Sequence, residues 1–278
     1  QKNARTVAGE VRQAIEAVAG EKVELGGSGR TDAGVHALAQ VAHLKTAGKL
    51  RREEILRAVN EALPADIHLL SLEPAGERFH ARHTATSRSY VYQISRRRTA
   101  LAKRFVWWVR RPLDLGAMRA GAALLAGRHD FARFCEKPLE QTPTVVVVER
   151  CEVETAGELI LVRVVASHFL WKMVRRVVGA LVEVGGGTLT LAALEGLLDP
   201  QGPAKPAEFQ PAETTAPPSG LFLERVLYPG DAPLGAVRPV TPMSLASSSA
   251  DLPSWRKACM RARSSGGSHS EAAASFPR

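Results

Sequence analysis

The chain has 278 residues, about two domains by length, and with 45% hydrophobic and 23% charged residues it can bury a sizeable core. Its formal net charge of +9, from 37 Lys and Arg against 28 Asp and Glu, suits an anionic partner such as nucleic acid. Three cysteines at unrelated spacings argue against a disulfide framework or a zinc knuckle and favour a reducing, cytoplasmic compartment, and no apolar run reaches membrane-spanning length.

Residues 1–84 predict a first α+β lobe. Helical spacing of apolar residues and strand-like alternation separate its elements. We expect helices over Val7–Val18 and Glu53–Leu63, and strands over Lys22–Leu25, Val35–Leu44 and Ile67–Leu72. This order lacks only a first strand to make a ferredoxin-like unit, and the chain starts with Gln rather than Met, which fits a shortened start.

Residues 85–230 predict a second α+β lobe with a similar mixture of elements. We expect strands over Ser89–Ile94, Val145–Val153, Leu159–Val165 and 220–228, and helices over Leu115–Leu125, Phe169–Val184 and 188–198. Beyond residue 230 the chain is rich in Ser, Ala, Pro and Arg without periodicity, which predicts a disordered tail over residues 231–278.

The glycine-rich stretch "GGSGRTDAG", residues 26–34, is the first candidate for chemistry. It lacks the Gly-Lys-Ser/Thr ending of a phosphate-binding loop, and a strand rather than a helix is expected after it. Arg30 and Asp32 point to the same side of an extended chain. Spacing alone nevertheless favours an ordinary turn, in which Asp32 bonds its own backbone. His36 and His43 match no metal-ligand spacing, so we expect no metal site.

Two further patterns stay ambiguous at this level. Basic residues between 88 and 111 alternate with aromatic ones, which fits either RNA binding or a solvated strand edge about equally. Arg175 falls within the most apolar predicted helix, where a buried guanidinium needs a carboxylate partner. An exposed position on that helix is somewhat the more common arrangement.

Four motifs that follow one another along the chain favour a functional role for these residues over a structural one. They are "GSGRTDAGVHALAQVAHL", "FHARHTATSRSYVYQI", "HFLWKMVRRVVGALVEVG" and "APPSGLFLERVLYP", which span residues 27–229. Together they closely resemble the signature segments of the TruA family of tRNA pseudouridine synthases. The resemblance implies two ferredoxin-like or RRM-like α+β lobes with mostly antiparallel sheets, a catalytic cleft between the lobes, and a homodimer.

The resemblance also implies an activity and its residues. Uridine would be isomerised to pseudouridine at positions 38 to 40, in the anticodon arm of tRNA, without metal or organic cofactor. Asp32 falls on the catalytic aspartate, Tyr90 on the active-site tyrosine, and Arg175 on the arginine that pairs with the aspartate. The remaining matches imply substrate contacts at Arg30, Arg82, Leu221 and Leu223.

The chain also departs from the family pattern. The family opens with a strand carrying Tyr-Asp-Gly and then Gly-Trp-Gln-x-Gln, and "QKNART" corresponds to a start at the last Gln. We therefore expect the first strand of the N-terminal lobe to be missing. Two alternatives follow: a tRNA-binding protein with impaired catalysis, or a pseudouridine synthase that acts on another RNA.

Overall fold

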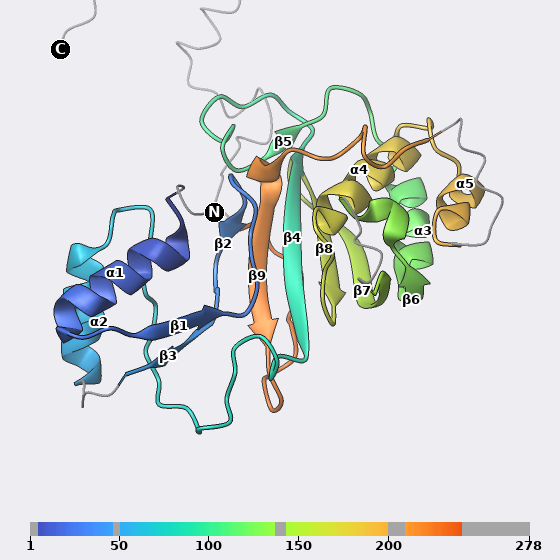
Figure 1. Cartoon of the computed structure of the whole chain (residues 1–278). Coiled ribbons are helices and arrows are strands. Elements are labelled where there is room, and N and C mark those ends of the chain that lie inside the picture. The colour runs from blue at the N-terminus through green and yellow to red at the C-terminus, as the bar shows by residue number, and fades with distance from the viewer. Residues whose placement is uncertain (1–4, 47–50, 137–142, 200–208, 241–278) are drawn as a thin grey trace, which may run out of the picture. The chain divides into compact units, whose positions relative to one another are not determined.

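The computed structural model describes residues 5–46, 51–136, 143–199 and 209–240 (Figure 1). Its fold is mixed α+β with mostly antiparallel sheets, which confirms the expected fold class. Among the described residues, no helix combines the length and the apolar character needed to span a bilayer.

The larger sheet contains seven strands. Their order is β2 (His36–Ala37), β9 (Leu221–Leu227), β4 (Ser87–Ser95), β8 (Leu159–Ala166), β7 (Val145–Ala156) and β6 (Gly127–Asp130), with β5 (Trp107–Trp108) pairing additionally with β4. Neighbouring strands are antiparallel except for the parallel pairs β2–β9 and β4–β5. Strand β9, the last strand of the described residues, thus lies between β4 and the short strand that follows Asp32.

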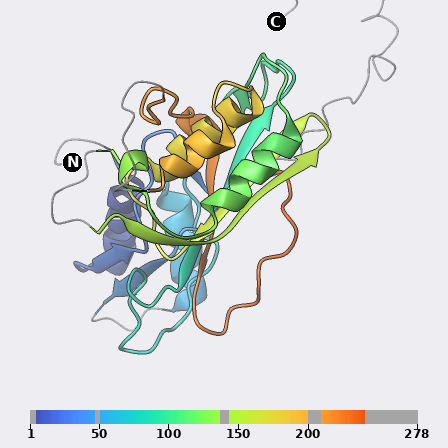
Figure 2. The same cartoon turned by 90° about the vertical axis from the view of Figure 1, so that its right-hand side faces the viewer.

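Two helices pack on one face of this sheet, as Figure 2 shows, and a third helix packs against these two. They are α3 (Leu115–Leu125), α4 (Met173–Gly185) and α5 (Leu191–Gly196). The side chains of Asp114 and Thr190 cap the first and the last of them, by accepting hydrogen bonds from the backbone N–H groups of Ala117 and Ala193. Buried Val, Leu, Ile and Phe side chains from the helices and from β4, β7 and β8 form the main hydrophobic core.

A second core lies under two other helices, α1 (Val7–Ala19) and α2 (Arg52–Ala62). These helices lie beside the two-stranded antiparallel sheet of β1 (Glu24–Gly27) and β3 (Ala42–Lys45) (Figure 1). Helix α1 begins at the Thr6 cap and ends at Gly20, whose left-handed backbone closes the last turn. The division into lobes at residue 84 stays a prediction.

Several sequence-based expectations about elements were wrong. Val35–Leu44 forms two strands, because His36–Ala37 pairs with β9 in the large sheet while Ala42–Lys45 pairs with β1. Ile67–Leu72 is not a strand: the side chain of Asn60 bonds both backbone groups of Leu69, at 3.0 and 2.7 Å, where a neighbouring strand would otherwise pair. The helix expected from Phe169 begins only at Met173, since Lys172 has a left-handed backbone, with φ of 62°. The short strands β5 and β6 had no counterpart among the elements expected from the sequence.

Residues 231–240 contact the large sheet. Arg163, which is buried on β8, donates from Nη1 to the carbonyl of Gly235 at 2.7 Å, and Val240 donates its N–H to the side chain of Gln93 at 2.8 Å. The expected tail of residues 231–278 therefore begins with a segment held on the sheet. Residues 241–278 lie outside the described residues.

Candidate active site

Asp32 begins a tight turn that precedes β2. The N–H of Val35 donates to the carbonyl of Asp32 at 3.1 Å, which closes the turn. Its third residue is Gly34, with φ of 80°, a conformation that side chains other than glycine rarely adopt. A Cβ added to Gly34 would also lie 3.1 Å from Cγ of Pro218. The turn is thus fixed by its own backbone and by close packing against the segment that leads into β9.

The carboxylate of Asp32 is held from a distant part of the chain. Arg175 Nη1 lies 3.4 Å from Oδ2, and the indole Nε1–H of Trp171 donates to Oδ1 at 3.1 Å. The side chain of Arg175 is 14% exposed and that of Asp32 30%. Asp32 is therefore one half of a partly buried ion pair, and each of its carboxylate oxygens has a donor from the segment at the start of α4. This arrangement differs from a turn in which the aspartate bonds its own backbone.

Arg175 is itself fixed by residues next to β9. Its Nε donates to the carbonyl of Ala216 at 2.7 Å, and the N–H of Ala216 donates back to the carbonyl of Arg175 at 3.1 Å. Because one nitrogen of the guanidinium is used on the backbone, Nη1 is directed at Asp32 by a planar, rigid group. Arg175 is therefore a partly buried arginine with a carboxylate partner, and not an exposed residue of the apolar helix.

The backbone next to Ala216 approaches α4 closely at Gly179. A Cβ added there would lie 1.9 Å from the carbonyl oxygen of Thr214, a contact with backbone that no side-chain rotation relieves. We expect Gly179→Ala to lower the free energy of unfolding by about 2–3 kcal/mol and to lower activity as well, because the displaced segment holds Arg175. Urea unfolding measures the first effect. Gly196→Ala, where an added Cβ meets nothing within 4 Å, is the matched control.

Tyr90 lies on β4, and its predicted site partners lie on β9. It is directly opposite Leu223, and Tyr92 is opposite Leu221. The ring of Tyr90 makes an edge contact with Phe169, with centroids 5.0 Å apart. Both leucines are buried, and Leu221 belongs to the main core. Their contact with substrate stays a prediction.

The electrostatic surroundings link Tyr90 to Asp32. Burial raises the pKa of Tyr90 to about 12, and the negative charge of Asp32 is the second cause. Burial likewise raises the pKa of Tyr228 to about 12 and shifts the pKa of Tyr92 upward. Tyr90 therefore carries a neutral hydroxyl, a hydrogen-bond donor, near the carboxylate at neutral pH.

A pH prediction follows, because these are the three tyrosines of the chain. We expect the folded protein to show almost no tyrosinate absorbance at pH 10, where tyrosines of the unfolded chain are about half ionised. Since the folded pKa values lie above the unfolded ones, their stabilising contribution is complete below pH 10 and is lost as the pH rises toward 12. Ultraviolet titration with and without denaturant measures this, and superimposable curves would contradict it.

The other two predicted substrate contacts are at the surface. Arg30 is exposed in the glycine-rich loop, and Arg82 is exposed before β4. Arg88, which the sequence grouped with possible RNA-binding residues, points inward instead. Its guanidinium donates to four backbone carbonyls: those of Arg82 at 2.6 Å, Ser167 at 2.8 Å, Ser28 at 3.3 Å and Ala85 at 3.5 Å. It thereby ties the glycine-rich loop to the ends of β4 and β8.

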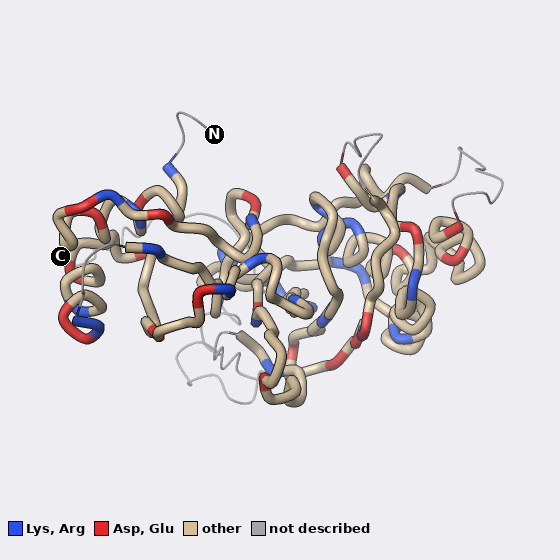
Figure 3. Tube along the Cα trace, turned by 60° about the horizontal axis from the view of Figure 1, so that its bottom comes forward, with Lys and Arg blue, Asp and Glu red and all other residues tan. Residues whose placement is uncertain are grey.

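The other basic residues between 88 and 111 also divide into those with structural partners and those at aromatic rings. Arg111 pairs with Glu183 at 2.6 Å, whereas Arg98 and Arg110 both lie over the ring of Trp108, at 5.5 and 5.1 Å from its centroid. Figure 3 shows basic and acidic residues interspersed along much of the trace. Part of the series is therefore structural, and only part is available to an anionic partner.

The two histidines near Asp32 also have structural contacts. His36 Nε2 lies 2.8 Å from the carbonyl of Arg104, and its ring stacks on Phe222 with centroids 4.8 Å apart. His43 is buried, and its Nδ1 accepts a hydrogen bond from the N–H of Ala81 at 3.2 Å. The two rings therefore tie the chain that follows the turn to other segments, at Arg104 and at Ala81.

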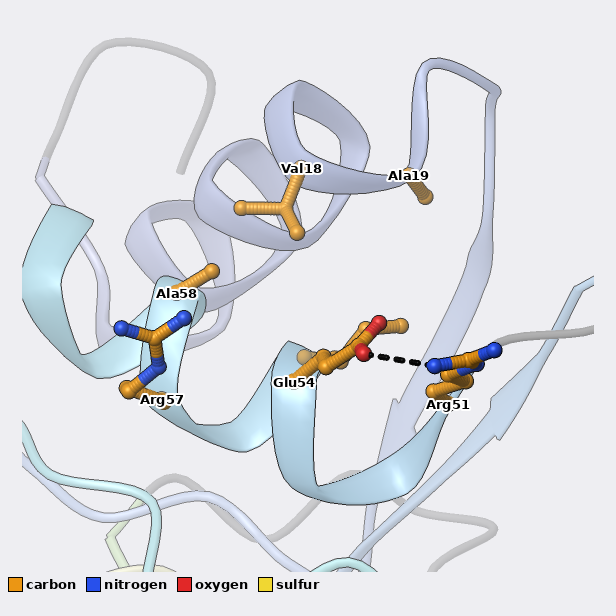
Figure 4. A pocket seen from close by; sticks show the side chains of 7 residues that line it. Val18, Ala19, Arg51, Glu54, Arg57 and Ala58 are labelled. Carbon is orange, nitrogen blue, oxygen red and sulfur yellow. Dashed lines mark hydrogen bonds and ion pairs between the residues drawn. The ribbon is translucent and has the colours of Figure 1, made fainter.

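A pocket of about 470 Å³ lies elsewhere, at the end of α1 and the start of α2 (Figure 4). Its lining includes Val18, Ile55 and the ion pair of Arg51 with Glu54. None of the predicted site residues contributes to this lining. The candidate site is therefore defined by the contacts of Asp32 rather than by this cavity.

Comparisons with known proteins show to which family the chain is similar. A family model described as tRNA pseudouridine synthase matches residues 1–83 and 122–229, which include Asp32, Trp171 and Arg175. Tyr90 lies between the two matched stretches.

Curated relatives match over most of their length. The tRNA pseudouridine synthase A of Mesorhizobium japonicum is 43% identical over 224 residues, which cover 79% of this chain and 88% of the relative. The protein of the same name from Methylococcus capsulatus is 38% identical over 82% of this chain and 83% of the relative, and that of a Thermoanaerobacter species 36% identical over 82% and 92%. The chain belongs to the tRNA pseudouridine synthase family.

Proposed function

We propose that this protein is an isomerase that converts uridine to pseudouridine in tRNA, with Asp32 as the catalytic carboxylate. One observation carries the assignment to Asp32: its ion pair with Arg175, which joins two segments that both match the family model. An aspartate in an ordinary surface turn has no need of a partly buried arginine 143 residues away.

The reaction sets requirements that these residues meet. The N1–C1′ bond of uridine breaks, the uracil turns, and C5 bonds to C1′; C5 loses its proton and N1, freed from the ribose, gains one, so substrate and product are isomers. A carboxylate acts on the ribose either as a nucleophile or as a base. Arg175 balances its charge and fixes its orientation, and the second lone pair on each oxygen is left for the substrate.

Tyr90 is the second proposed catalytic residue. Its ring offers a flat face to a uracil taken out of its stack, and its neutral hydroxyl donates or relays a proton late in the reaction. Arg30 and Arg82 are proposed substrate contacts because both are exposed cations and because Arg88 ties the glycine-rich loop to the backbone of Arg82. Leu221 and Leu223 would form the apolar floor beneath the base.

The finer assignments also belong to this proposal. The substrate would be the anticodon arm of tRNA, at positions 38 to 40, in a cleft between the two lobes. The protein would act as a homodimer in the cytoplasm, where tRNA is abundant and free cysteines stay reduced.

Tritium release from tRNA labelled at C5 of uridine tests the proposal directly. We expect release from whole tRNA and from an isolated anticodon arm with uridine at positions 38 to 40. Release should be lost when those uridines are replaced by cytidine. Equal release from RNA without an anticodon arm would overturn the substrate assignment, and binding of tRNA without any release would overturn the enzymatic one. Analytical ultracentrifugation tests the dimer.

A further inference from the structure

Trp171 is an exposed aromatic residue at the candidate site. The residue is 52% exposed, although tryptophan is usually mostly buried. The same side chain donates from Nε1 to Asp32 at 3.1 Å. A tryptophan that shows half of its surface to solvent while bonding a catalytic carboxylate is more than a packing residue.

The position of Trp171 is well fixed by its neighbours. Its carbonyl accepts a hydrogen bond from the N–H of Glu136 at 2.9 Å. The next residue, Lys172, has a left-handed backbone, which holds the chain in a turn before α4. Lys172 Nζ pairs with Glu136 at 3.3 Å and lies 5.5 Å from the centroid of the Trp171 ring. The indole is thus held by the backbone hydrogen bond with Glu136, by the turn at Lys172 and by the ammonium group of Lys172 beside the ring.

We propose that Trp171 positions Asp32 through its Nε1–H and that its exposed ring stacks on a base of the substrate RNA. This inference rests on the proposed function. With Arg175 on Oδ2 and Trp171 on Oδ1, rotation of the carboxylate breaks one bond or the other, so both donors are needed for a single orientation. An exposed indole beside a catalytic carboxylate suits a nucleotide because every base presents a stacking face.

Two variants separate the two roles. Trp171→Phe keeps an aromatic face and removes the donor. Trp171→Gln keeps an N–H donor, four bonds from Cα as in tryptophan, and removes the face. For Trp171→Phe we expect the single-turnover rate to fall by about 10- to 100-fold, as for other hydrogen bonds to charged groups, with Kd for tRNA changed by less than about threefold. For Trp171→Gln we expect Kd to rise by about 10-fold or more, with most of the rate at saturating tRNA retained.

The measurements are single-turnover tritium release at saturating tRNA, filter-binding Kd and thermal unfolding. Leu70→Ala, at another exposed apolar residue, is the control and should change neither rate nor Kd. A normal rate for Trp171→Phe would overturn the positioning role, and an unchanged Kd for Trp171→Gln would overturn the stacking role. Parallel losses of rate and thermal stability in both variants would show a structural role only.

The unsubstituted protein separates this inference from the proposed function. If it releases no tritium, the proposed function fails. If it releases tritium and the Trp171 variants match it, the function stands and the inference about Trp171 fails.

Discussion

Asp32→Asn is expected to lower the single-turnover rate of pseudouridine formation by about a thousandfold or more, while Kd for tRNA changes by less than about threefold. The amide has the size of the carboxylate and keeps one oxygen for Arg175 or Trp171, so the turn closed by Val35 should form as before. It lacks the negative charge that a nucleophile or a base toward ribose requires. Tritium release and filter binding on the same preparation measure both quantities.

The control for this substitution is Asp66→Asn. Asp66 is an exposed carboxylate that pairs with Arg5, and none of its contacts involves the candidate site. It should leave rate and Kd unchanged. A rate for Asp32→Asn within about tenfold of the unsubstituted protein would exclude Asp32 as the catalytic carboxylate.

Arg175→Ala has the second-largest expected effect, and it falls on both rate and stability. The substitution removes the bond to Asp32 at 3.4 Å and the bond to Ala216 at 2.7 Å. We expect the rate to fall by about 100-fold and the free energy of unfolding to fall by about 2–3 kcal/mol. The second figure lies below that for a fully buried pair because Asp32 is 30% exposed, so water partly solvates the carboxylate left behind. Single-turnover kinetics and urea unfolding measure the two effects.

Two further variants make the Arg175 prediction specific. Arg175→Lys keeps the positive charge, but its single nitrogen replaces a guanidinium that donates to both Asp32 and Ala216. Compared with Arg175→Ala, it should therefore recover part of the free energy of unfolding and little of the rate. Arg57→Ala removes an exposed arginine that pairs with Glu61 at 3.8 Å, and should behave as the unsubstituted protein. Normal stability and turnover in Arg175→Ala would refute the pairing with Asp32.

The secondary structure was largely predictable where one pattern governed a whole element. Leu115–Leu125 is the helix expected from its spacing, and β7 and β8 lie where apolar runs placed them. The errors occur where a tertiary contact replaces the local pattern. Val35–Leu44 has strand-like composition throughout, but its ends pair with different sheets, and no local signal shows where the chain changes from one to the other.

The candidate site was predictable in part, and mainly through resemblance. Spacing alone favoured an ordinary turn for Asp32 and an exposed position for Arg175, because a partner 143 residues away leaves no trace in local periodicity. Their pairing came from the family motifs, and the two side chains do lie within contact distance. The catalytic and substrate-contact roles stay predictions.

Trp171 and Arg88 were missed for different reasons. The apolar pattern runs from Phe169 to Val184, so Trp171 was expected to be helical. The indole instead lies toward Asp32 because Lys172 has a left-handed backbone conformation, which the composition of the segment does not reveal. Arg88 was grouped with its basic neighbours, although its partners are backbone carbonyls, which any sequence provides.

The placement of β2 beside β9 has a consequence for how the protein is made. The backbone after Asp32 is anchored by a strand at residues 221–227, and the donors to its carboxylate come 139 and 143 residues later. During synthesis the N-terminal third therefore leaves the ribosome with the carboxylate of Asp32, the proposed catalytic group, still without these partners. The candidate site is assembled only when nearly all of the described chain has been translated, so a prematurely terminated product would carry Asp32 without either of its side-chain donors.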